Sequence, residues 1–117
     1  MKNDRSWPPE LDALTAAPEN HRLLFENDSI RVLDTSIAAG QTTSLHTHRW
    51  PAALYIVSWS DFVRRDECGQ IILDSRTIAL PAPGCAMWTP SLAPHTLENI
   101  GTSELRVIAV ELKKDQK

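Results

Sequence analysis

Short apolar stretches follow one another along the chain from residue 21 to residue 112. The segment 30–37 alternates between apolar and polar positions, 53–59 is rich in β-prone residues, and 105–112 forms a last strand. Further strands are expected at 21–26, 46–48, 61–65, 70–73, 76–80, 85–89 and 96–100, with a loop around Pro94. Turn-forming clusters separate these segments about every 8 to 12 residues, which is typical of a β-sandwich or barrel.

The first 20 residues differ from the rest of the chain. Pro8, Pro9 and Pro18 interrupt any long element, and Glu10 to Ala17 is expected to form one short helix. We predict a single domain with an N-terminal arm at 1–20, a barrel at 21–112 and a charged tail at 113–117. The arm is expected to lie on the barrel or on a partner subunit.

Charge and hydropathy exclude several classes of function. The net charge is -3 and no basic stripe is present, which argues against nucleic-acid binding. No segment approaches the roughly 20 apolar residues of a transmembrane helix, and the N-terminus has no apolar run typical of a signal peptide. We therefore expect a cytoplasmic protein without membrane contact, in which Cys68 and Cys85 are reduced thiols.

Three of the four histidines fall in two short patterns. The first is Gly40-x5-His46-x-His48, and the second is Gly84-x5-Pro90-x4-His95-x3-Asn99. Two imidazoles one residue apart on a strand point to the same side, because strand side chains alternate. A third ring from a neighbouring strand completes a set of nitrogen ligands for one divalent ion. The sequence thus predicts a metal site at His46, His48 and His95.

The fourth histidine, His21, lies outside both patterns. A histidine without motif spacing is usually a surface or packing residue. We therefore expect His21 to be a surface or arm residue without a ligand role.

The two patterns resemble the two motifs of the cupin superfamily over about residues 22 to 112. The first cupin motif also carries a glutamate, which would fall at Ala52 or Ala53, and the second has a glycine where this chain has Leu92. The closing glycine of the first motif is replaced within 58–60. The resemblance implies an all-β double-stranded β-helix, or jelly-roll barrel, with a metal in its mouth.

The missing carboxylate bears on the chemistry. Three neutral imidazoles leave the full +2 charge on a bound ion, which then attracts anionic chelating ligands. Diketone-cleaving and thiol dioxygenases, cupins that resemble this arrangement, work with three histidines and Fe(II). The residues themselves do not choose among Fe, Zn, Mn, Ni and Cu.

The pocket is expected to be apolar, with Leu54, Ile56 and Trp88 facing the interior and Asn99 also turned inward. Such a pocket suits a small, flat, partly hydrophobic anion. No catalytic acid, base or nucleophile stands out beside the metal ligands, so any chemistry is expected to come mainly from the ion.

Two functions are compatible with these residues. The first is an Fe(II)-dependent dioxygenase-like enzyme acting on a small anionic chelating substrate. The second is a non-catalytic module that binds a metal and a small ligand. On either reading we expect a homodimer, with Trp7 or the Arg22 to Phe25 stretch at the interface.

Overall fold

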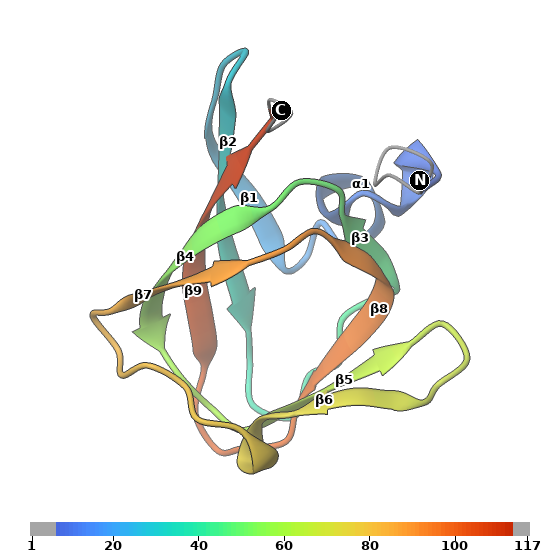
Figure 1. The fold of residues 1–117 in the computed structure, drawn as a ribbon. Coiled ribbons are helices and arrows are strands. Elements are labelled where there is room, and N and C mark those ends of the chain that lie inside the picture. The colour runs from blue at the N-terminus through green and yellow to red at the C-terminus, as the bar shows by residue number, and fades with distance from the viewer. Residues whose placement is uncertain (1–6, 114–117) are drawn as a thin grey trace.

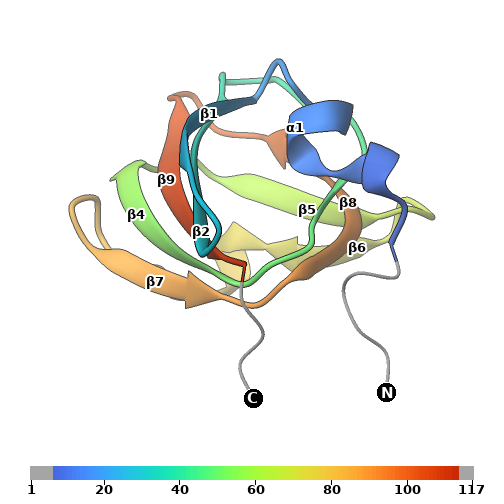
Figure 2. The same cartoon turned by 90° about the horizontal axis from the view of Figure 1, so that it is seen from above.

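Two antiparallel sheets form the protein in a computed structural model, which describes residues 7–113 (Figure 1). The five-stranded sheet has the spatial order β1 (His21–Glu26), β2 (Ile30–Ile37), β9 (Leu105–Leu112), β4 (Ala52–Ser58) and β7 (Ala86–Thr89). The four-stranded sheet has the order β3 (His46–His48), β8 (Leu92–Asn99), β5 (Phe62–Asp66) and β6 (Ile71–Asp74). Seen from above, the two sheets curve around a common interior (Figure 2). The all-β fold expected from the strand pattern is confirmed.

Alternation on the strands explains which side chains face this interior. On β9 the buried side chains are Leu105, Val107, Ala109 and Glu111, every second residue. The intervening residues are partly exposed. Because β9 pairs with both β2 and β4 along its length, it fixes the register of these two strands in the centre of the five-stranded sheet.

The N-terminal segment packs at one end of the barrel. A 3-10 turn (Pro9–Leu11) leads into the short helix α1 (Ala13–Ala16), which is shorter than the helix expected from the sequence. The side chain of Asp12 caps α1 by accepting a hydrogen bond from the Leu14 amide at 3.2 Å. Helix α1 contacts β1 and β3, as Figure 1 shows, so it lies beside the histidines that these strands carry.

Two local expectations are wrong. The segment 76–80 is not a strand, because Ser75–Thr77 forms a 3-10 turn in which the Asp74 side chain accepts from the Arg76 amide at 3.0 Å. Pro94 is not in a loop but inside β8. The pairing of β8 with β3 is irregular between His46 and His48, and a proline, which has no amide hydrogen, is tolerated at such a place.

No helix within residues 7–113 has the length and apolar character needed to span a bilayer.

Candidate metal centre and cavity

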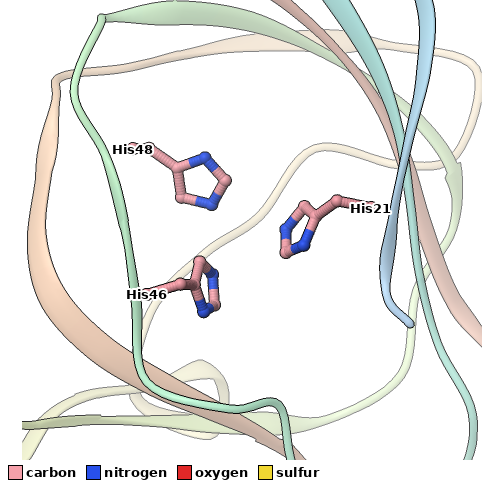
Figure 3. A group of neighbouring side chains, drawn as sticks. All are labelled: His21, His46 and His48. Carbon is pink, nitrogen blue, oxygen red and sulfur yellow. The ribbon is translucent and has the colours of Figure 1, made fainter. Parts of the chain in front are cut away.

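All four histidines of the chain lie together inside the barrel. His46 and His48 lie on β3, and His95 lies on β8 directly opposite His46 in the strand pairing. His21 is the first residue of β1, which belongs to the other sheet. Figure 3 shows the rings of His21, His46 and His48 pointing toward one another across the space between the two sheets.

The distances among the rings identify a converging group. One nitrogen from each of His21, His46 and His48 lies within 4.8 Å of the other two. The ring of His95 is 4.4 Å from that of His46 and 5.6 Å from that of His48, measured between centroids. His46 and His48 therefore belong both to the set predicted from the motifs and to the closest group in the structure.

The expectation that His21 is a surface or arm residue is wrong. Its side chain is buried, with only 4% of its surface exposed, and its ring centroid is 4.8 Å from that of His46. His21 pairs with Thr35 of β2, which is also buried, so this end of β1 faces inward. No motif spacing marks His21, because its place beside β3 depends on how the two sheets close.

Backbone carbonyls hold three of the rings in one tautomer. Nδ1 of His46 donates to the Ser44 carbonyl and Nδ1 of His95 to the Ala93 carbonyl, each at 2.7 Å. Nδ1 of His21 lies 3.0 Å from the Ala17 carbonyl. A carbonyl oxygen only accepts, so each Nδ1 carries the hydrogen and each Nε2 keeps its lone pair. This is the state in which an imidazole binds a metal.

Burial also keeps these rings uncharged. Desolvation, together with the mutual repulsion of the rings, lowers the pKa of His46 and of His48 to about 3. The same causes lower the pKa of His95 to about 2, and burial lowers the pKa of His21. At neutral pH the rings are therefore neutral and need not lose a proton before binding an ion.

A carboxylate missing from the first motif is present on the neighbouring strand. Glu111 of β9 pairs with Ala52 of β4, one of the two positions where the motif glutamate would fall. The Glu111 side chain is only 1% exposed, and its Oε2 lies 3.4 Å from Nδ1 of His48. A carboxylate in this place can orient the His48 ring, as carboxylates do for metal-binding histidines in other proteins. The apolar alternation of Leu105, Val107 and Ala109 continues to Glu111, so the sequence of β9 itself indicates that Glu111 faces inward.

An ion-pair network links Glu111 to the N-terminal segment. Oε1 of Glu111 accepts from Nε of Arg31 at 2.7 Å, and the Arg31 guanidinium also holds Asp12 through two hydrogen bonds of 3.0 and 2.9 Å. Burial raises the pKa of Glu111, and Arg31 offsets this only in part. Because Asp12 also caps α1, the network fastens α1 to the barrel beside His48.

A cavity of about 240 Å³ opens beside the histidines. Its lining includes all four histidines, Glu111 and a majority of apolar side chains. Two residues expected in the pocket are among them: Leu54 is partly buried, and Trp88 is 55% exposed, which places Trp88 at the rim. The cavity is smaller than the pockets that hold drug-sized molecules, so its size suits a small ligand.

The other two residues expected in the pocket lie in the packed interior, outside the cavity lining. Ile56 is fully buried in an apolar cluster with Phe62 and Val107. Asn99 is fully buried and donates two hydrogen bonds of 2.9 Å to the carbonyls of Ile37 and Ser103. Asn99 therefore holds two backbone segments together.

Comparison with solved structures identifies the type of fold. No protein-family model matches the sequence, and no curated protein matches it. A cupin domain from Bordetella pertussis Tohama I superposes with a TM-score of 0.64 at 15% identity, over 80% of this chain and 92% of that one. An RmlC-like cupin family protein with a double-stranded β-helix fold from Methanocaldococcus jannaschii gives 0.56 at 13% identity, over 79% and 77%.

The polyketide cyclase RemF from Streptomyces resistomycificus superposes with a TM-score of 0.53 at 19% identity, over 85% of this chain and 68% of that one. At these identities the likeness concerns the fold and does not extend to an activity. Together with the sheet topology, these structures show that the chain has the cupin fold, the double-stranded β-helix that its two histidine motifs predicted.

Proposed function

We propose that the protein binds one divalent metal ion through its four histidines and acts as a dioxygenase-like enzyme on a small, anionic, chelating substrate. His46 and His48 supply the central pair of ligands, His95 supplies the third from β8, and His21 supplies a fourth from the opposite sheet. The observation that supports this most strongly is the group of His21, His46 and His48, whose imidazole nitrogens lie within 4.8 Å of one another beside a cavity. The His95 ring lies next to this group, 4.4 Å from that of His46 between centroids.

The donor set suits such an ion. Imidazole is a good ligand for Fe, Zn, Ni and Cu, and the carbonyl partners on Nδ1 leave Nε2 available on His21, His46 and His95. Four neutral imidazoles leave the +2 charge uncompensated, which favours an anionic ligand. Bound Fe(II) would supply the redox chemistry that a dioxygenase requires.

Other residues of the chain orient a histidine ring, form the walls that contact a substrate, and exclude water from the cavity. Glu111 orients the His48 ring, and Leu54 gives the cavity an apolar wall beside the histidines. Trp88 lies at the rim, where a bound substrate would cover its exposed ring. An apolar, water-poor cavity protects reactive species from side reactions.

Metal binding is tested first, on protein purified without added metal and then titrated with Fe(II), Zn(II) or Mn(II). We expect a single ion per chain, and X-ray absorption spectroscopy is expected to count four imidazoles. His46→Gln and His48→Gln should each lower metal affinity at least about 100-fold, beyond the roughly 10- to 100-fold effect of losing an outer partner. Three imidazoles with His21→Gln behaving as wild type would restrict the site to His46, His48 and His95.

Catalysis is tested separately by oxygen uptake of the anaerobically Fe(II)-loaded protein with diketones, thiols and small aromatic diols. We expect uptake with one of these classes, abolished in His46→Gln. A loaded protein that binds such ligands but consumes no oxygen would contradict the enzymatic part of the proposal.

That last outcome is the one expected of a non-catalytic module that binds a metal and a small ligand. One observation favours this second candidate. Of the carboxylates among residues 7–113, only Glu111 lines the cavity, and Arg31 already engages it. No free acid or base is therefore available there to move a proton.

We also propose that the protein forms a homodimer through β1. This strand is at the edge of its sheet, and Leu23, Leu24 and Phe25 are 44%, 42% and 51% exposed. Apolar side chains on an open edge strand favour association with a second chain. Light scattering should give twice the chain mass, and Phe25→Glu should give a monomer. A monomeric wild-type protein would contradict this.

A further inference from the structure

The cavity carries one positive charge that the metal site does not use. Arg64 of β5 lines the cavity, and its Nε is buried without a hydrogen-bond partner among the described residues. No carboxylate within residues 7–113 forms an ion pair with Arg64, whereas the adjacent Arg65 pairs with Glu98 at 2.8 Å. Because side chains alternate along β5, these two arginines lie on opposite faces of the sheet.

The neighbours of Arg64 do nothing to compensate its charge. Its partners across the strand pairing are Leu97 on β8 and Leu73 on β6, and both also line the cavity. Residues directly opposite in antiparallel strands share a face of the sheet, so leucines flank the aliphatic part of the Arg64 side chain on both sides. Burial lowers the pKa of Arg64, and no nearby anion raises it.

The charge of Arg64 also reaches the histidine group. Arg64 and the histidines line the same cavity, and its charge is among the causes that lower the pKa of His46, His48 and His95. Glu111 is the remaining formal charge among the described residues that line the cavity, and Arg31 already neutralises it. An unpaired charge in such a place lowers the stability of the fold, which a purely structural role does not explain.

We propose that Arg64 is a specificity-determining residue, whose guanidinium pairs with a carboxylate on a small ligand while the ligand's other end lies at the histidines. The planar fork of arginine matches a carboxylate with two parallel hydrogen bonds. The leucine walls accept the apolar body between the two ends. This inference rests on the proposed function only for the metal ion that the other end of the ligand would contact at the histidines.

The test compares acids with their neutral amides. Benzoate, hexanoate and 3-mercaptopropionate, each beside its amide, are titrated by calorimetry into metal-free and Zn(II)-loaded protein. In both forms, wild-type protein should bind at least one acid about tenfold more tightly than its amide. Arg64→Met should lose this preference by lowering affinity for the acid while leaving the amide unchanged.

Two controls separate recognition from packing. Arg65→Met removes an adjacent arginine of the other face and should keep the preference, and Arg64→Lys, which retains the charge, should keep part of it. The melting temperature of ligand-free Arg64→Met should rise, because a partly buried charge without a partner is replaced by an apolar chain between leucines.

Three results would overturn the inference. One is an acid preference in Arg64→Met equal to that of wild type, which would show that the metal or another group binds the carboxylate. Another is an equal loss of acid and amide binding together with a lower melting temperature, as expected of a packing residue. The third is no saturable binding of any acid by wild type up to about 10 mM. Failure to bind metal leaves the metal-free titrations interpretable, so the two proposals fail independently.

Discussion

The two ends of the barrel interior have opposite chemistry although the same strands build both. Along β9 the inward residues are Leu105 and Val107 at one end and Ala109 and Glu111 at the other. The first two belong to an apolar cluster with Ile37, Ile56 and Phe62. The other end contains Glu111, its partner Arg31 and the histidines.

The difference separates the main source of the fold's stability from the proposed metal site. The apolar end buries hydrophobic surface, which is the main source of folding free energy. Most members of its cluster also form apolar walls of the cavity. The histidine end buries rings held neutral against their usual pKa and a carboxylate whose pKa is raised. Such groups lower the stability of a ligand-free protein, and they are the groups that the proposed ion and ligand would contact.

The largest expected effect comes from the apolar end. Ile56→Ala should lower the free energy of unfolding by about 2 to 5 kcal/mol, because Ile56 is fully buried and its truncation leaves a cavity. Chemical denaturation measures this, and Val57→Ala, at a neighbouring residue that is 39% exposed, is the matched control. Metal affinity of the folded variant should stay as in wild type. A parallel loss of metal binding would show that the two ends are not separable.

A second effect arises at the histidine end on acidification of the metal-free protein. In the unfolded chain these histidines bind protons below about pH 6.5. In the folded protein the pKa of His46 and of His48 is about 3 and that of His95 is about 2, so the rings stay neutral to much lower pH. Stability is therefore complete above pH 6.5 and falls as the pH decreases, by roughly 1.4 kcal/mol per pH unit for each fully titrating ring.

The raised pKa of Glu111 opposes this loss of stability at low pH. The contribution of one ring is therefore measured as the difference in pH dependence between wild type and a variant. Urea denaturation of wild type and His95→Gln from pH 7.5 to 5.5, with a chelator present, should give a shallower pH dependence for the variant. Identical slopes would mean that His95 is not held neutral in the fold.

The features predictable from the sequence are those encoded locally. The strands follow from apolar alternation, and the facing of His46 and His48 follows from their spacing on one strand. Motif order then predicted the cupin fold, which the structure and its structural relatives confirm. Errors appeared where local hydrogen bonding overrode propensity, as in the turn at Ser75–Thr77.

The features that were missed depend on contacts between distant segments. His21 reaches the site because β1 joins the edge of one sheet while β3 belongs to the other. Glu111 takes the place opposite Ala52 only through the register of β4 with β9, and Arg31 reaches Glu111 across 80 residues. Strand register depends on the closed barrel as a whole, so periodicity within one strand does not specify it.

A third and smaller effect tests the role of Glu111 within the histidine end. Glu111→Gln should lower metal affinity about 10- to 100-fold, or roughly 1.4 to 2.7 kcal/mol, because the amide is a weaker partner for the His48 Nδ1 hydrogen. Competition with a chelator of known affinity measures this. Glu98→Gln changes a carboxylate paired with Arg65 away from the histidines and should bind metal as wild type does. Equal affinities in all three proteins would limit Glu111 to its ion pair with Arg31.

The smallest effect is expected outside the barrel interior altogether, at the pair between Arg65 and Glu98. Their side chains are 34% and 36% exposed, so water and salt screen the attraction that the 2.8 Å contact provides. Arg65→Ala should change the free energy of unfolding by less than about 1 kcal/mol and leave metal affinity unchanged. Denaturation at low and high salt measures the first quantity, and the small difference should shrink further at high salt. A loss as large as that of Ile56→Ala would mean that the fold depends on its outer charges as much as on its apolar interior, and the contrast between the two ends would no longer explain where its stability resides.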